Sequence, residues 1–137
     1  MRAPAVHRVT VILVAAVMAL AACGGNDQED AEQTVRDFVT ATNERDGTRF
    51  CEELVTQEFL EQTTGATGER AAGACRRQLE SIRGLRLKLV KIRGTEVDGD
   101  SARVTVALET QGRTQVQSLR LEKEDGDWRL SGGSGTD

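Results

Sequence analysis

Apolar residues recur at helical spacing in the first part of the chain and at alternating spacing in the second. In the segment 29–45, the inward positions are three, four or seven residues apart: Ala31, Val35, Phe38, Val39 and Thr42. This spacing predicts an amphipathic helix. Two shorter helical segments follow, one at 49–55 with Thr48 as its expected N-cap, and one after Thr56 that carries Phe59 and Leu60.

A third helix is predicted over residues 69–82. It carries one apolar stripe at spacings of three and four, made by Ala72, Cys75, Leu79 and Ile82. The loop before it, residues 63–68, consists of Thr, Gly and Ala. The first part of the chain is therefore expected to form three helical regions.

From Leu85 onward the apolar period changes from 3.6 to 2, which is typical of strands. Leu85, Leu87 and Leu89 alternate with polar residues, and Val90 and Ile92 then fall on the opposite parity, which predicts a β-bulge. Further apolar residues alternate after it: Ala102, Val104, Val106 and Leu108, then Val116, Leu119 and Leu121, then Trp128 and Leu130.

Three turn sequences separate these strands, at Asp98-Gly99, Gln111-Gly112 and Asp125-Gly126. Three turns joining four strands predict an antiparallel meander. Helices followed by a meander predict an α+β fold, with three N-terminal helices packed on one face of a bent antiparallel four-stranded sheet. Residues 132–137 are expected to form a loose C-terminal tail.

The N-terminus has the pattern of a targeting segment. After a basic start with Arg2, His7 and Arg8, an apolar run extends from Val9 to Ala22. A membrane-spanning helix needs about 20 apolar residues, whereas the apolar part of a secretory signal needs roughly 7–15. Residues 1–22 are therefore predicted to be a cleaved signal peptide, and the alternative is a short membrane anchor or a buried helix.

The run ends in Leu20-Ala21-Ala22-Cys23, followed by Gly24-Gly25, and this sequence resembles a bacterial lipobox. The resemblance implies cleavage before Cys23 and thioether attachment of diacylglycerol to it. Acyl chains such as palmitate would then hold the protein on the extracytoplasmic face of a cell-envelope membrane. Residues 23–28 are expected to be a flexible tether and residues 29–131 the folded domain. The alternative is ordinary secretory cleavage nearby with Cys23 left free.

Cys51 and Cys75 are the two cysteines that remain. In an oxidising compartment, two cysteines on the apolar faces of helices favour a structural disulfide. The alternatives are a metal site and a catalytic thiol. Both are disfavoured because a zinc site needs more ligands than two cysteines, and a nucleophilic cysteine needs a neighbouring base, usually His.

Composition narrows the chemistry further. The chain has 137 residues, a formal net charge of −4, one His and no Tyr, and its length suits one domain. Removal of residues 1–22 leaves 16 Lys and Arg against 22 Asp and Glu, with neither His nor Tyr. These two residue types do much acid–base catalysis. A negative total also argues against nucleic-acid binding, which needs an excess of cations.

The order of elements resembles the NTF2-like (cystatin-like superfold) family. The resemblance is carried by the segments 31–39 and 50–60 and by the closing strand Asp125-Gly-Asp-Trp-Arg-Leu130. It implies a cone with an open cavity between helices and sheet, used for small apolar ligands or for dimerisation. A cavity lined by residues such as Phe38, Leu87, Val104 and Leu121 would favour ligand binding or a simple core, and a filled cone would leave only interaction at the surface.

Enzymes of that family resembling ketosteroid isomerase, scytalone dehydratase or epoxide hydrolase use Asp, Tyr or His in the cavity. Here no Tyr or mature His can be carried over, and Asp37 is expected on a solvated face of the first helix. The two Asp-Gly-Asp sequences are explained by hairpin turns rather than by calcium binding. The sequence therefore predicts no catalytic residues, no metal and no cofactor.

The predicted function is a lipid-anchored lipoprotein that binds a partner protein or a small apolar ligand. The alternatives are an enzyme that uses a cavity carboxylate and a structural envelope lipoprotein. Charge gives one hint of a partner, because residues 70–93 contain eight basic residues and one acid, Glu80. The candidate anionic-partner patch is Arg76, Arg77, Arg83, Arg86, Lys88, Lys91 and Arg93.

This basic block has two interpretations. It could be a solvated face that pairs with the acidic first helices, where residues 23–69 hold 12 acids and 3 bases. It could instead bind anionic lipid head groups, a cell-wall polymer or an acidic protein.

Overall fold

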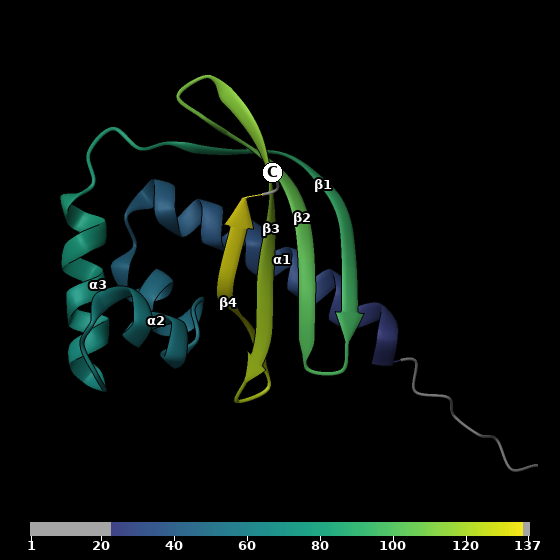
Figure 1. Cartoon of the computed structure of the whole chain (residues 1–137), viewed down its shortest axis with the longest axis horizontal. Helices are drawn as coiled ribbons and strands as arrows, with labels where there is room; N and C mark the ends of the chain where they lie inside the picture. The colour runs from purple at the N-terminus through teal and green to yellow at the C-terminus, as the bar shows by residue number, and fades with distance from the viewer. Residues whose placement is uncertain (1–22, 136–137) are drawn as a thin grey trace, which may run out of the picture.

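The computed structural model describes residues 23–135. Its elements are, in chain order, α1 (Cys23–Glu44), the π-helix η1 (Arg49–Glu53), α2 (Gln57–Thr64), α3 (Glu69–Ser81), β1 (Leu87–Asp98), β2 (Ser101–Thr110), β3 (Arg113–Glu124) and β4 (Asp127–Gly135). Helix α1 lies along one face of the sheet, and α2 and α3 stand at one end of it (Figure 1). The predicted α+β class, with helices packed on a four-stranded antiparallel sheet, is confirmed.

The sheet is a meander in the order β1-β2-β3-β4, with each neighbouring pair antiparallel. The turn between β2 and β3 places Gln111 at φ 53° and Gly112 at φ 76°. Two successive residues with positive φ are the geometry of a tight hairpin whose twist matches that of its strands. All three predicted turns are present.

Strand β1 contains the predicted bulge. Its register with β2 shifts between Leu89 and Lys91, at the place where the apolar parity changes, and again between Ile92 and Gly94. Each shift leaves one residue of β1 unpaired and places the side chains after it on the opposite face of the sheet from the one that their alternation would give. Ile92 and Val97 consequently pack against the same core as Leu87 and Leu89.

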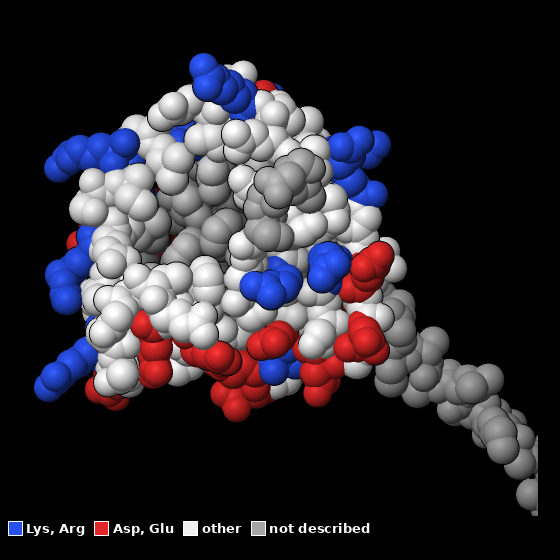
Figure 2. Space-filling model, viewed as in Figure 1, with Lys and Arg blue, Asp and Glu red and all other residues white. Residues whose placement is uncertain are grey.

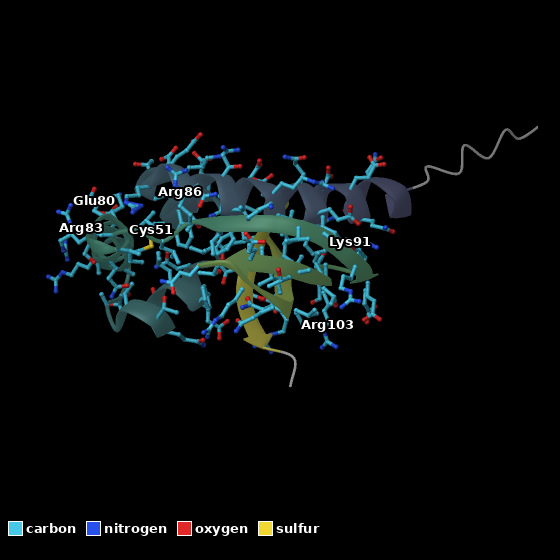
Figure 3. All side chains as sticks on the ribbon, turned by 90° about the horizontal axis from the view of Figure 1, so that it is seen from above. Cys51, Glu80, Arg83, Arg86, Lys91 and Arg103 are labelled. Atoms are coloured by element: carbon cyan, nitrogen blue, oxygen red, sulfur yellow. A yellow bond between two sulfur atoms is a disulfide. The ribbon has the colours of Figure 1, made fainter. Side chains whose placement is uncertain are left out.

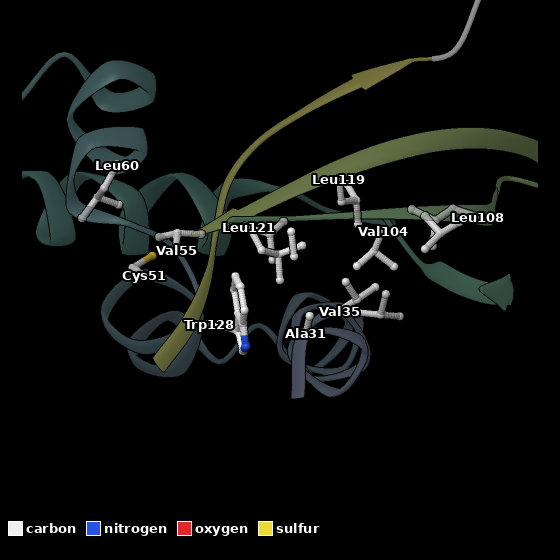
Figure 4. Packing of buried hydrophobic residues seen from close by; sticks show 14 of the residues in the cluster. Ala31, Val35, Cys51, Val55, Leu60, Val104, Leu108, Leu119, Leu121 and Trp128 are labelled. Carbon is white, nitrogen blue, oxygen red and sulfur yellow. The ribbon is translucent and has the colours of Figure 1, made fainter. Parts of the chain in front are cut away.

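The core lies between α1 and the sheet, where the side chains of both meet (Figure 4). Its largest fully buried side chains are Leu121, Val35, Val55, Val104 and Val106. Trp128 on β4 closes the core beside α1, with 5% of its surface exposed. Burial of such side chains, at about 1.5–3 kcal/mol each relative to exposure, holds the helix on the sheet.

The two ends of the domain differ from expectation. Residues 23–28, expected to be a flexible tether, are the first turns of α1. Asp27 holds these turns to the sheet because its Oδ1 lies 2.8 Å from Lys123 Nζ on β3. The expected loose tail is also wrong over residues 132–135, which continue β4 and pair with β3 from Gly132↔Arg120 to Gly135↔Gln117. The predicted signal peptide, residues 1–22, lies outside the described residues.

Local details of the helical segments differ as well. Thr56 caps α2 as predicted, since its Oγ1 accepts from Phe59 N at 3.2 Å. Thr48 makes no side-chain cap. Asp46 takes that role, with its Oδ1 accepting from Arg49 N at 3.1 Å. Within the described residues, no helix is long and apolar enough to cross a membrane.

The apolar stripe of α3 is shifted by one residue at its start and is shorter at its end. Its buried residues are Ala71, Cys75 and Leu79, rather than the predicted set beginning with Ala72. The helix ends at Ser81, and Ile82 follows in an extended conformation with 40% of its surface exposed. Ile82 is therefore not part of the core.

Candidate functional site

The two remaining cysteines are bonded to each other. Cys51 on η1 and Cys75 on α3 form a disulfide with their Cα atoms 6.0 Å apart. Both are buried, at 2% and 7% exposure, on the helix faces that the sequence pattern assigned to the core. Because each sulfur is bonded to the other, neither is a thiolate that could attack a substrate or bind a metal.

The interior of the expected cone is filled at the predicted lining residues. Val104 and Leu121 are 0% and 1% exposed and belong to the packed cluster against α1. Phe38 and Leu87 are partly buried against the same cluster, and the Phe38 ring lies 5.1 Å from that of Phe50. These four residues contribute to a core rather than to the wall of an open cavity.

One groove, of about 510 Å³, lies between α1, η1 and the start of β4. It contains Asp37, the acid considered above. Asp37 Oδ2 lies 3.1 Å from Arg49 Nη2, and its Oδ1 accepts from Gln33 Nε2 at 3.0 Å. Asp37 is thus on the surface as expected, but both of its oxygens are occupied by neighbouring side chains. The carboxylate of Asp37 is therefore not free to act on a ligand in this groove.

A second groove, of about 550 Å³, lies between α1 and the free edge of β1. Lys91 and Arg93 line it, together with residues of the first turns of α1. Glu32 on α1 is held there by Thr95 Oγ1 at 2.8 Å and by Arg36 at 3.6 Å. Two members of the predicted basic patch, Lys91 and Arg93, thus lie beside α1 at the edge of the sheet.

The seven residues of the predicted patch therefore fall into two groups. Arg76 and Arg77 belong to α3, Arg83 and Arg86 to the segment that connects α3 with β1, and Lys88 to the start of β1. Lys91 and Arg93 lie farther along β1. Figure 3 shows Arg83 and Arg86 at the helical end of the molecule and Lys91 toward the opposite end. The structure does not gather all seven into one patch.

The basic block does not neutralise the acidic helices. Among the described residues, Arg76 is its one member in an ion pair, with Nη1 lying 2.8 Å from Glu52 Oε1. The other described ion pairs join Arg36 to Glu32, Arg49 to Asp37, Lys123 to Asp27 and Arg129 to Glu124. The interpretation as a face paired with the first helices thus holds for Arg76 alone.

The start of α1 forms a clamp on the sheet that the sequence pattern missed. Lys123 bonds to Asp27 and also lies 5.2 Å from the centre of the Trp128 ring. The hydrogen bond from Lys123 lowers the pKa of the Asp27 carboxyl, and the same bond raises the pKa of Lys123. No local signal reveals this contact, since Asp27 precedes the apolar helical pattern and its partner lies on β3.

The two Asp-Gly-Asp sequences occupy hairpin turns, as expected. Within the part of the chain that the structure describes, no group of three His, Cys, Asp or Glu side chains could hold a metal ion.

No family model matches the chain, and no curated protein does. Solved structures do resemble it. A provisionally assigned ketosteroid isomerase from Kribbella flavida is 24% identical, with 81% of each chain covered and a TM-score of 0.50. A de novo designed protein with a curved β-sheet is 16% identical, with 78% of this chain and 99% of the design covered and a TM-score of 0.50.

An NTF2-like protein of unknown function from Cytophaga hutchinsonii is 15% identical, with 77% of this chain and 89% of that chain covered and a TM-score of 0.48. The matches at a TM-score of 0.50, which cover 81% and 78% of this chain, support an NTF2-like fold. At these identities they establish the fold alone, because one fold serves many chemistries.

Proposed function

We propose that the protein is a lipoprotein, anchored through Cys23 on the extracytoplasmic face of a membrane, whose NTF2-like domain works by binding a partner protein and not by catalysis. The disulfide supports an extracytoplasmic site, since such bonds persist in oxidising compartments. The lipobox-like sequence directly before Cys23 supports the anchor.

The observation that carries the binding function is the chemistry of the interior. Among the described residues, the buried polar side chains are Thr34, Thr42 and Thr56. None of them is a carboxylate, whereas an acid–base enzyme of this fold would hold one where burial shifts its pKa toward a working value. A packed core at Val104 and Leu121 also favours a macromolecular partner over a small apolar ligand.

The anchor is tested by the substitution Cys23→Ala. The wild-type chain should fractionate with membranes, and its N-terminal peptide should carry the mass of a diacylglycerol thioether. Cys23→Ala should appear in the soluble fraction because no acyl chain can attach to it. Gly24→Ala is the control and should stay with the membrane. A Cys23→Ala variant that remains membrane-bound would show that residues 1–22 themselves anchor the chain.

The binding function is tested by native mass spectrometry of the protein purified from its own host in mild detergent. A co-purified protein subunit would support a macromolecular partner. A bound molecule of a few hundred daltons would instead assign the domain to the small-ligand class and contradict the proposal.

A further inference from the structure

One surface of the helical end carries cations that nothing in the described chain neutralises. We call it the Arg face and define it as Arg70, Arg77, Arg83 and Arg86, together with Ile82. All five are exposed. Basic side chains line the outer edge of α3 in Figure 2, and Figure 3 places Arg83 and Arg86 at the same end.

The cations of this face are unpaired in residues 23–135. None of the four arginines takes part in a described ion pair. The one acid of the surrounding block, Glu80, is in no described ion pair either. Arg76 is left out of the face because Glu52 holds it. Like charges gathered without partners repel each other, and an external anion would relieve that repulsion.

The type of cation indicates which chemical class of anion the face would bind. From Arg70 to Arg86 every basic residue is arginine and none is lysine. The planar guanidinium donates two parallel hydrogen bonds to a carboxylate, and arginine is enriched in protein interfaces whereas lysine is depleted. A face that only attracted a polyanion would function equally well with lysine.

An apolar residue among these charges also favours a protein as the partner. Ile82 is 40% exposed, and Val90 is the other exposed large hydrophobic residue of the described chain. An apolar centre with a charged rim is the usual composition of a protein–protein interface.

The position of the face also fits a partner. Helix α3 and the first turn of α1 lie at opposite ends of the molecule (Figure 1). With Cys23 anchored, the Arg face would therefore be held away from the attachment point.

From these observations we infer that the Arg face docks an acidic protein surface, with Asp and Glu carboxylates bound by the four guanidinium groups and an apolar side chain packed on Ile82. The inference rests on the proposed binding function and names the chemistry of its partner.

The test uses the full chain in non-ionic detergent, so that its outcome does not depend on the fate of Cys23. Poly-L-glutamate and a copolymer of glutamate and tyrosine are the probes, and the dissociation constant is measured at physiological ionic strength. The triple substitution Arg77→Gln, Arg83→Gln and Arg86→Gln should weaken binding of both probes about tenfold or more. The matched triple Lys91→Gln, Arg93→Gln and Arg103→Gln removes as many charges elsewhere and should change binding less than twofold.

Two further variants distinguish a protein surface from a generic polyanion. Replacing the same three arginines by lysine keeps the charge but loses the paired hydrogen bonds, and should weaken binding about threefold. Ile82→Ser should weaken binding of the copolymer and leave that of poly-L-glutamate unchanged.

Four results would overturn the inference. The first is that neither acidic probe binds, and the second is that both Gln triple variants weaken binding equally. The third is that inorganic polyphosphate binds more tightly than the acidic probes and that replacing the arginines by lysine does not change its affinity. The fourth is a salt-sensitive self-association that the Arg→Gln triple variant abolishes. The third would assign the face to a phosphate polymer and the fourth to a second copy of the chain. Loss of the lipid anchor alone would leave all these measurements unchanged.

Discussion

The α1–sheet body and the helical end formed by η1, α2 and α3 are stabilised in different ways. In the body, α1 and the strands bury Val35, Val104, Val106 and Leu121 almost completely. At the helical end, α3 buries Ala71, Cys75 and Leu79. One covalent bond, from Cys75 to Cys51, joins α3 to the segment that leads into the body.

The difference shows how a short chain can keep one side of a helix out of its core. A helix that is held by a broad apolar face must bury that face in the core, so less of its surface stays exposed. Helix α3 depends on a narrow stripe and a disulfide, so the rest of its circumference can carry exposed arginines at small cost in stability. We expect the body to determine the stability of the fold and the helical end to tolerate changes on its outer surface.

Removal of core volume should have the largest effect. Leu121→Ala empties a site that is 1% exposed between the sheet and α1. We expect the free energy of unfolding to fall by about 4 kcal/mol, because lost burial and a residual cavity add together. Urea unfolding followed by circular dichroism measures it. An exposed leucine-sized control is Ile82→Ala, which should cost less than about 1 kcal/mol. Similar losses at the two sites would remove the contrast between the regions.

Loss of the disulfide should have the next largest effect and should be localised. The double substitution Cys51→Ser and Cys75→Ser opens a loop whose ends are separated by 24 positions. The chain-entropy model predicts a loss of about 3 kcal/mol. Amide hydrogen exchange should rise first in α2 and α3 and last in β2. Equal loss of protection in both regions would mean that they unfold as one unit, and Cys23→Ala is the control for removing a cysteine.

The clamp at the start of α1 should have the smallest effect, and one that depends on pH. The pKa of Asp27 is lowered in the folded protein. Its contribution to stability is therefore present above the unfolded pKa, about 3.9, and disappears as the pH falls through the lower folded value. Lys123 has a raised pKa, so the contribution is also lost at alkaline pH, as the pH rises through the folded value.

Asp27→Asn should accordingly lower the urea midpoint slightly at pH 7, and by progressively less as the pH falls below the unfolded pKa of the carboxyl. Asp125→Asn, which removes an exposed turn carboxylate with no described ion pair, is the control and should give parallel curves. A constant difference between Asp27→Asn and the wild type down to pH 2 would show that the ionised carboxylate is not what ties the first turn of α1 to β3.

The sequence predicted what depends on local periodicity. The period of 3.6 that ends at Ile82 and the period of 2 that begins at Leu85 locate the boundary between helices and sheet. The parity change at Val90 located a bulge. The Asp-Gly and Gln-Gly pairs located the turns, because few residues accept positive φ there.

The parts that sequence analysis missed depend on contacts between distant segments. Asp27 looked like part of a tether because its partner, Lys123, lies on the third strand. Residues 132–135 looked like part of a tail because they are Gly- and Ser-rich, yet they pair with β3. The division of the basic block also needed three dimensions, since it arises because β1 runs away from the helical end and carries Lys91 with it (Figure 3).

The helical state of the chain at Cys23 sets the mechanical character of any attachment there. Acyl chains linked to a free segment would let the domain swing and search a wide volume. Acyl chains linked at the first residue of a 22-residue helix, itself clamped to β3, transmit their position directly to the domain. A domain attached in this way would move little relative to the membrane and would keep one orientation. A partner would then have to approach it at a distance from the bilayer set by the length of one small domain.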